Sequence, residues 1–260
     1  MKLGVIIQAR MGATRFPGKV LKNLNGKPVL WHVVNRCRAS KSVDKVVVAT
    51  TTEKGDAAIE QFCKKNKIPC FRGSSGNVLS RYYEAAKKFK IDIVARITSD
   101  CPLTDPSTID ICLNSFLKQK SDYISNMVPG KRTYPIGLSV EIFKFKALEK
   151  AYKEAHQEYE KEHVTPYIWE NRKNNFKIGN IVPAPRSLNR PYRLTVDYQE
   201  DFALLDMIYE KFSNYKLVPL TKVISFLDKH PEIASINSEC EKKYHAHAPI
   251  NLARDNVSTK

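Results

Sequence analysis

Short apolar runs alternate with amphipathic stretches along the first half of the chain. A brief apolar run predicts a strand buried on both faces, and apolar residues at helical spacing predict a helix packed against it. The predicted strands are Leu3–Ile7, Val43–Thr50, Pro69–Phe71 and Ile91–Ile97. The predicted helices are Pro28–Ala39, Asp56–Asn66, 78–88 and Pro106–Leu117, the last capped by Asp105. Repeated strand–helix units predict an α/β fold with a doubly wound, mostly parallel sheet.

The alternation becomes irregular after Asp122. Here the pattern predicts the strands Tyr134–Phe143, Phe176–Val182 and Tyr192–Val196, and the helices Phe145–Glu154, Glu160–Arg172, Gln199–Phe212 and Thr221–Asp228. From His230 onward the periodicity weakens. We therefore expect one domain over residues 1–230, in which residues 122–185 form a small sheet-extending subdomain, followed by a C-terminal tail over 231–260.

Composition narrows the class of protein. The 260 residues are 42% hydrophobic, which suits a globular domain with a full core. No run approaches the length of a membrane span, and the N-terminus shows no basic-then-apolar leader. The six cysteines form no C-x-x-C pair, which indicates reduced thiols. We expect a cytoplasmic protein that does not engage a membrane.

The formal net charge of +16 has two explanations. It is typical of nucleic-acid binders, whose affinity comes largely from phosphate neutralisation. However, lysines are spread over predicted helix surfaces, and no recognition motif or aromatic–basic array is present. Solubility together with an anionic small substrate explains the excess more simply, so we expect no nucleic-acid partner.

Three cations, Arg10, Arg15 and Lys19, lie in the loop that follows the first predicted strand. Gly12 and Gly18 allow the loop backbone to approach a ligand closely, so that its N–H groups can join the contact. Arginine binds phosphate oxygens in bidentate fashion. The loop is therefore predicted to bind phosphates, with a solvated basic turn as the alternative.

This loop matches neither common phosphate-binding motif. The spacing of Gly12 and Gly18 is too long for a Walker A loop, and Val20 stands after Lys19 where that motif requires Ser or Thr. The G-x-G-x-x-G fingerprint of dinucleotide-binding folds is also absent. The sequence therefore predicts phosphate binding of another kind.

Two aspartates, Asp100 and Asp197, end predicted strands and precede predicted helices. Ligands of doubly wound sheets lie beyond the carboxyl ends of the strands, so both carboxylates are expected near the cationic loop. Carboxylates opposite a phosphate-binding loop are what a Mg²⁺–triphosphate site requires. Each aspartate alone is equally explained as a helix N-cap.

At this point the motifs carry a family resemblance. The chain contains Ala9-Arg10-x-x-x-Thr14-Arg15-x-Pro17-Gly18-Lys19, Asp100-Cys101-Pro102-Leu103 and Val196-Asp197-Tyr198-Gln199-Glu200-Asp201. These resemble the cytidylyltransferases that activate acidic sugars, the CMP-Kdo and CMP-sialate synthetases. Gln8-Ala9-Arg10-Met11, Arg72-Gly73-Ser74, Arg96-Ile97-Thr98-Ser99-Asp100 and Glu162-His163-Val164-Thr165-Pro166-Tyr167 resemble more closely the branch named for spore-coat polysaccharide biosynthesis protein F.

The resemblance implies a Rossmann-like fold of the nucleotide-diphospho-sugar transferase type, a homodimer, Mg²⁺ as cofactor, and CTP and a sugar as substrates. It implies that Asp100 and Asp197 hold the metal, and that Arg10, Lys19 and Asp100 are catalytic. The residues that it implies for nucleotide binding are Gln8, Ala9, Arg10, Gly12, Thr14, Arg15, Lys19, Arg72, Asn77 and Arg81.

The acceptor side is less defined. Thr98-Ser99 stands where CMP-Kdo synthetases carry Gln-Gly, so the acceptor sugar and the choice of CTP stay open. The candidate acceptor-binding residues are Arg132, Tyr134, Glu141, Glu162 and His163. An arginine and a histidine can bind the carboxylate of an acidic sugar. The alternatives are another nucleotide or a sugar phosphate as substrate, a nucleic-acid-binding protein, and a non-catalytic scaffold.

Overall fold

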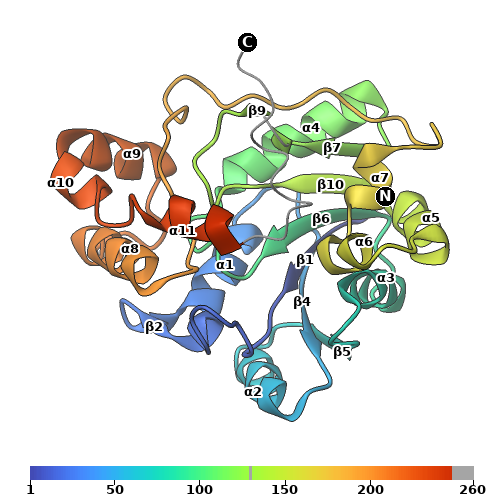
Figure 1. Ribbon diagram of the computed structural model, residues 1–260, viewed down its shortest axis with the longest axis horizontal. Coiled ribbons are helices and arrows are strands. Elements are labelled where there is room, and N and C mark those ends of the chain that lie inside the picture. Colours follow the sequence, from blue (N-terminus) through green and yellow to red (C-terminus); the bar gives the residue numbers. More distant parts are fainter. Residues whose placement is uncertain (129–130, 248–260) are drawn as a thin grey trace.

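A six-stranded sheet forms the centre of the protein (Figure 1). The computed structural model describes residues 1–128 and 131–247. The strand order is β5-β4-β1-β6-β10-β7. The strands are β1 (Leu3–Gln8), β4 (Lys45–Thr51), β5 (Cys70–Gly73), β6 (Ile93–Thr98), β7 (Tyr123–Ser125) and β10 (Glu141–Lys144). The first four along the chain run parallel, whereas β10 pairs antiparallel with both β6 and β7.

Helices cover both faces of the sheet, as the doubly wound prediction requires. The helices α1 (Val29–Arg38), α2 (Ala57–Lys65) and α4 (Pro106–Gln119) pack on one face. The helices α3 (Val78–Lys88), α5 (Phe145–Glu154), α6 (Glu158–His163) and α7 (Pro166–Glu170) pack on the other. Because strand residues alternate between faces, Val5 and Ile7 join the first core and Ile6 joins the second. The α/β, mostly parallel fold is confirmed.

A third apolar cluster lies to one side of the sheet, under the last helices of the chain (Figure 1). It joins α8 (Gln199–Lys211) and α9 (Leu220–Lys229) to Phe16 and Leu103 from the first half of the chain. The remaining elements are η1 (Lys19–Leu21), β2 (Asn23–Leu24), β3 (Lys27–Pro28), η2 (Lys54–Asp56), β8 (Met127–Val128), β9 (Lys131–Arg132), α10 (Pro231–Ala234) and α11 (Cys240–His247).

The predicted elements of the first half are confirmed to within a few residues, including the cap of α4. There the Asp105 carboxylate accepts a hydrogen bond from the backbone N–H of Thr108 at 2.9 Å. The second half contains errors. Of the predicted strand Tyr134–Phe143, only the end belongs to a strand, β10. The predicted strands Phe176–Val182 and Tyr192–Val196 are wrong, since each contributes only an isolated bridge.

The predicted helix Glu160–Arg172 is interrupted and forms α6 and α7 instead. Val164 has a positive φ of 73°, which ends α6, and Pro166 then starts α7 in a first-turn position that needs no N–H. Within the predicted tail, Pro231–Ala234 form α10 and Cys240–His247 form α11, while 248–260 lie outside the described residues. Among the described helices, none has the length and apolar character needed to cross a bilayer.

Candidate active site

A cavity of about 590 Å³ opens beyond the carboxyl ends of β1 and β6. The chain leaves β1 toward β4 and β5 on one side, and returns to place β6 on the other, so this is the switch point of the sheet. The predicted nucleotide-site residues that line the cavity are Gln8, Ala9, Arg10, Thr14, Arg15, Lys19 and Arg81. Asp100, Asp197, Glu162 and His163 line it as well. Most of the predicted site is thus brought together.

Lys19 joins the two predicted metal-binding aspartates. Its Nζ lies 2.9 Å from Oδ2 of Asp100 and 2.8 Å from Oδ1 of Asp197, and it donates to the carbonyl of Val196 at 2.5 Å. Gly18, whose φ is 70°, precedes Lys19 in a left-handed conformation that favours glycine. The carboxylates therefore converge on one point at the cavity wall.

The ionisation of this group is set by the balance of burial and charge. Burial lowers the pKa of Lys19, but the attraction of Asp100 and Asp197 outweighs it, and the net pKa is raised above 10.5. Burial would raise the pKa of Asp100, yet Lys19 and local hydrogen bonds lower it to about 2. Both groups are therefore charged at neutral pH.

Asp197 is fixed by cations and by a second carboxylate, Asp201, to which the sequence analysis gave no role of its own. Arg15 lies 3.2 Å from its Oδ1, and Arg193 lies 2.8 Å from its Oδ2. The fully buried Asp201 pairs with Arg193 at 2.9 Å and accepts the backbone N–H groups of Asp197 and Tyr198 at the start of α8. The spacing Arg193-x-x-x-Asp197-x-x-x-Asp201 was the available sequence signal.

The cationic loop is attached to the α2 side of the sheet through Asp56. This buried carboxylate accepts the backbone N–H of Met11 at 2.6 Å and the hydroxyl of Thr51. The carbonyl of Met11 accepts the N–H groups of Ala13 and Gly18, each at 2.9 Å. Gly12, in contrast, has open space at its missing side chain and does not line the cavity. Its predicted role in close backbone approach has no support in this geometry.

The segment before α3 contributes differently from the prediction. Arg81 lines the cavity, and donates to the carbonyl of Ser74 at 2.8 Å, with a pKa lowered by burial. Asn77 instead caps α3 by accepting the Ser80 N–H at 2.8 Å. Arg72 pairs with Glu60 at 2.8 Å and donates to two backbone carbonyls. Neither Arg72 nor Asn77 lines the cavity.

On the acceptor side the structure separates the five predicted residues. Glu162 and His163 line the cavity from α6, together with Glu158. Burial lowers the pKa of His163 below 6.5, so it is neutral at pH 7.

The other three predicted acceptor residues do not line the cavity. Tyr134 is 1% exposed and packs in the third apolar cluster. Arg132 is exposed and pairs with Glu241 at 3.0 Å. Glu141 is buried beneath the cavity wall, where it pairs with Arg96, a lining residue that the prediction omitted.

Helix α11 reaches the phosphate loop from the far end of the chain. The Tyr244 ring lines the cavity, and the Arg15 guanidinium lies over it at 4.9 Å from the ring centroid. Lys243 pairs with Glu200 at 2.6 Å and holds the helix against α8. The segment predicted to be a tail therefore supplies part of the site.

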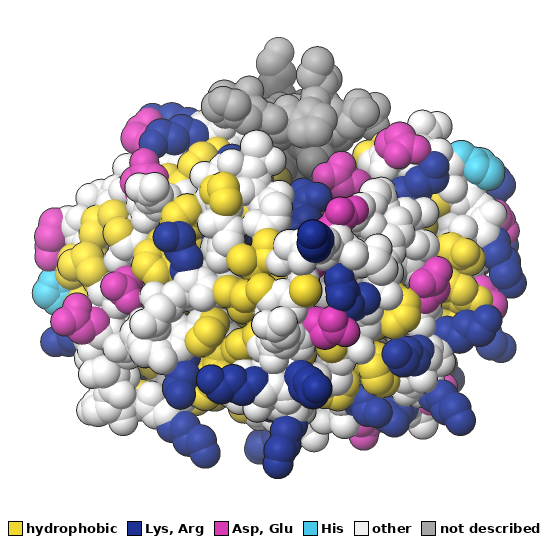
Figure 2. Space-filling view, turned by 90° about the horizontal axis from the view of Figure 1, so that it is seen from below, with side chains coloured by type: hydrophobic (Ala, Val, Ile, Leu, Met, Phe, Trp, Pro, Cys, Tyr) yellow, Lys and Arg dark blue, Asp and Glu magenta, His cyan; other side chains and the backbone are white. Residues whose placement is uncertain are grey.

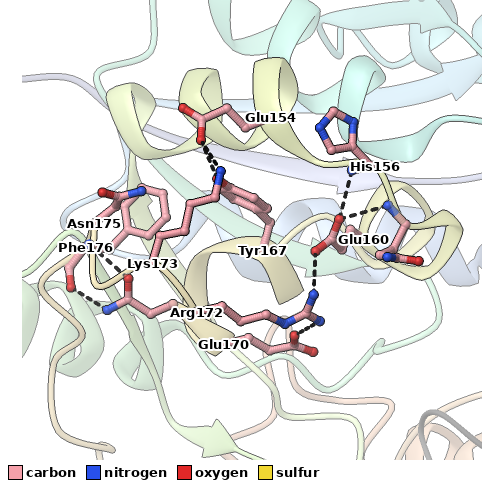
Figure 3. A pocket seen from close by; sticks show the side chains of 11 residues that line it. Glu154, His156, Glu160, Tyr167, Glu170, Arg172, Lys173, Asn175 and Phe176 are labelled. Carbon is pink, nitrogen blue, oxygen red and sulfur yellow. Dashed lines mark hydrogen bonds and ion pairs between the residues drawn. The ribbon is translucent and has the colours of Figure 1, made fainter.

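A smaller pocket of about 150 Å³ lies around α5, α6 and α7 (Figure 3). Its charged groups pair among themselves: Arg172 contacts Glu170 and Glu160, and the Tyr167 hydroxyl donates to Glu154 at 2.6 Å. The larger cavity holds most of the predicted site residues and is the stronger candidate for substrate binding.

The chain is similar to known proteins along nearly its whole length. The family model described as cytidylyltransferase matches residues 4–246. The uncharacterized protein MJ1063 of Methanocaldococcus jannaschii is 41% identical over 243 residues, covering 94% of this chain and 97% of that protein. The spore coat polysaccharide biosynthesis protein SpsF of Bacillus subtilis is 34% identical over 239 residues, covering 88% and 95%.

A solved structure of a cytidylyltransferase is similar to this chain in both sequence and fold. The cytidylyltransferase from Leptospira borgpetersenii superimposes with a TM-score of 0.82 at 36% identity, covering 90% of this chain and 97% of that one. The chain therefore belongs to the cytidylyltransferase family, whose members are nucleotidyltransferases. The resemblance inferred from the motifs, including the branch of the spore-coat protein, is confirmed.

Proposed function

We propose that this cytidylyltransferase transfers CMP from CTP to a hydroxyl of an acidic sugar, releases pyrophosphate, and serves the synthesis of a surface polysaccharide or glycan. The observation that carries the proposal is the convergence of Arg15, Lys19, Asp100 and Asp197 at the switch point of the sheet. A triphosphate needs cations along its length and a metal-binding carboxylate pair, and this wall of the cavity offers both.

The residues present fit Mg²⁺. Oxygens of Asp100 and Asp197 converge on Lys19 within 2.9 Å, so these two residues would hold the ion. The other Asp100 oxygen, Oδ1, accepts a hydrogen bond from the Cys101 thiol at 3.5 Å. In the described part of the chain no three His, Cys, Asp or Glu side chains form a metal cluster, so phosphate oxygens and water would complete the coordination. When bound, such an ion polarises the phosphoryl oxygens.

The protein's own groups would act by positioning and charge. Arg10, Arg15 and Lys19 would hold the β- and γ-phosphates and stabilise the charge that develops on the leaving pyrophosphate. Glu162 and His163 of α6 would border the acceptor on the opposite wall. Bringing the sugar hydroxyl in line with the α-phosphorus would then account for much of the rate.

Two features of the proposal rest on the family resemblance: the acidic nature of the sugar and a homodimeric assembly. Sedimentation velocity would test the homodimer directly. The rival proposal of nucleic-acid binding predicts a continuous basic surface. Figure 2 shows one face of the molecule, on which Lys and Arg side chains are dispersed among acidic and apolar ones. This dispersion favours solubility as the role of those charges on that face.

Protection against thermal unfolding by each of the four nucleoside triphosphates, with Mg²⁺ present, tests the nucleotide assignment. Ligands that bind only the folded protein raise its melting temperature, and CTP should raise it most. Asp100→Asn should lose the Mg²⁺-dependent part of this protection, while Asp110→Asn, an exchange remote from the cavity, should keep it. Equal protection by all four nucleotides, or protection by another one alone, would contradict the choice of CTP.

A further inference from the structure

Arg96 is a partly buried cation at the cavity wall with unused hydrogen-bonding capacity. It lies on β6, directly opposite Glu141 of β10 and beside Ile6 of β1. Its side chain is 15% exposed and lines the cavity. One terminal nitrogen pairs with Glu141, whereas Nε is buried and has no hydrogen-bond partner among the described residues. A buried donor without a partner is costly, so its retention requires an explanation.

Glu141 is held in place from below. Its Oε1 accepts the hydroxyl of Tyr123 at 2.8 Å and that of Thr165 at 2.5 Å, and its Oε2 is engaged by Arg96. With both oxygens engaged, Glu141 does not need the remaining guanidinium donors. Burial lowers the pKa of Arg96, but Glu141 outweighs it and keeps the group charged. The carboxylate thus acts as a clamp that orients the guanidinium.

The surroundings of Arg96 separate it from the phosphate loop. The sheet face that carries Arg96 also carries Gln8, whose side-chain oxygen is buried and has no hydrogen-bond partner in the described part of the chain. Above them α6 presents His163, neutral at pH 7, and the exposed carboxylates Glu158 and Glu162. The cations Arg15 and Lys19 pair instead with Asp197. On the α6 side of the cavity, the sheet therefore supplies the polar side chains of Arg96 and Gln8, and α6 supplies the exposed carboxylates of Glu158 and Glu162.

We propose that Arg96 is a specificity-determining residue that binds an oxyanion of the acceptor, with Glu141 as its positioning residue. This inference rests on the proposed transfer to a sugar. A carboxylate or a phosphate fits the planar guanidinium through charge-assisted hydrogen bonds. A neutral acceptor leaves the buried donors unpaired, which is how polar sites reject analogues that lack the matching group.

The test is a two-substrate kinetic matrix with CTP and three kinds of acceptor. The probes are 3-deoxy-octulosonate and N-acetylneuraminate as carboxylated sugars, glucose 1-phosphate as a phosphorylated sugar, and N-acetylglucosamine as a neutral one. Pyrophosphate release reports turnover. Wild-type protein should prefer an anionic acceptor, and the better of the two anionic classes identifies the source of the oxyanion.

The decisive variant is R96Q combined with E141Q, which removes both charges and keeps polar groups in the sheet. It should raise the acceptor KM about 10-fold to 100-fold, the loss expected for a charge-assisted contact, and leave the CTP KM within about 2-fold. R38Q, on an exposed side chain of α1, is the control. R96K should restore part of the acceptor affinity, which a purely structural role would not require.

The outcomes separate the two proposals. If a neutral sugar reacts best, or if the double variant raises the KM values of CTP and acceptor alike, the role of Arg96 is refuted while cytidyl transfer stands. If the wild-type protein neither binds CTP nor releases pyrophosphate with any acceptor, the proposed function fails first. If the double variant does not fold, the single variant E141Q decides. It should still raise the acceptor KM, because Glu141 no longer holds the Arg96 guanidinium in place. An unchanged acceptor KM refutes the positioning role of Glu141.

Discussion

Replacing Lys19 by methionine should change how the stability of the protein depends on pH. Methionine keeps most of the side-chain volume but removes the ammonium that lies 2.9 Å from Asp100 and 2.8 Å from Asp197. Asp197 keeps Arg15 and Arg193 as ion-pair partners. Asp100 has no other ion pair within the described residues, so it carries most of the effect.

The magnitude follows from the pKa of Asp100. Burial opposes its ionisation, but Lys19 and hydrogen bonds hold its pKa at about 2, below the ordinary 3.8. At about 1.4 kcal/mol per pH unit, this difference stabilises the folded protein by about 2 kcal/mol. Because the folded-state pKa is depressed, this stability is present above pH 3.8 and is lost as the pH falls toward 2. Without Lys19, burial dominates and the pKa of Asp100 rises.

The assay is urea denaturation of both proteins between pH 3 and 7. Near neutral pH, K19M should be less stable by about 2 kcal/mol, and the difference should shrink as the pH falls and Asp100 of the variant becomes protonated. Lys118→Met, which removes an exposed lysine of α4, is the matched control and should leave the curve unchanged. Parallel curves for K19M and wild type over the whole range would refute the assigned coupling between Lys19 and Asp100.

Three further predictions concern the site and the fold. Arg10→Ala should weaken CTP binding about 10-fold more than CMP binding in calorimetric titrations, because it removes a contact to the outer phosphates; equal losses would place Arg10 elsewhere. Tyr244→Ala should raise the CTP KM severalfold, since the ring under Arg15 is lost, whereas Tyr244→Phe should not. Gly137→Ala should lower the free energy of unfolding by about 2 kcal/mol or more, because φ is 95° and the added carbon would lie 2.5 Å from the carbonyl oxygen of Leu194.

The first half of the fold was predictable because local and global preferences agree there. Each strand is a short apolar run, and each helix carries its own cap or amphipathic face, as Asp105 and Asn77 illustrate. The placement of Asp100 near Lys19 followed from one topological rule, that ligands gather at the carboxyl ends of parallel strands. The family resemblance implied the other predicted nucleotide-site residues that line the cavity.

The second half was less predictable because tertiary contacts override its local pattern. Residues 176–182 look like a strand, yet they form one isolated bridge with the sheet edge, between Tyr123 and Ile178, and separate backbone hydrogen bonds instead of a continuous ladder. Tyr134 and Glu141 were assigned to the acceptor by their place in the chain, but Tyr134 fills a core and Glu141 lies below the cavity. Side-chain direction within an irregular segment has no periodic signal in the sequence.

Several charges of the site are already paired before substrate arrives. Arg96 pairs with Glu141, and Lys19 pairs with Asp100 and Asp197. Arg96 keeps Nε without a partner among the described residues, so it retains a donor while Glu141 stays in place. Lys19 can bind a phosphate only by giving up a carboxylate. A triphosphate that draws the ammonium away leaves two carboxylates facing each other, and a cation then becomes the favourable partner for them. Binding of triphosphate and of Mg²⁺ would thus be linked through Lys19, each raising the affinity of the other to the same extent.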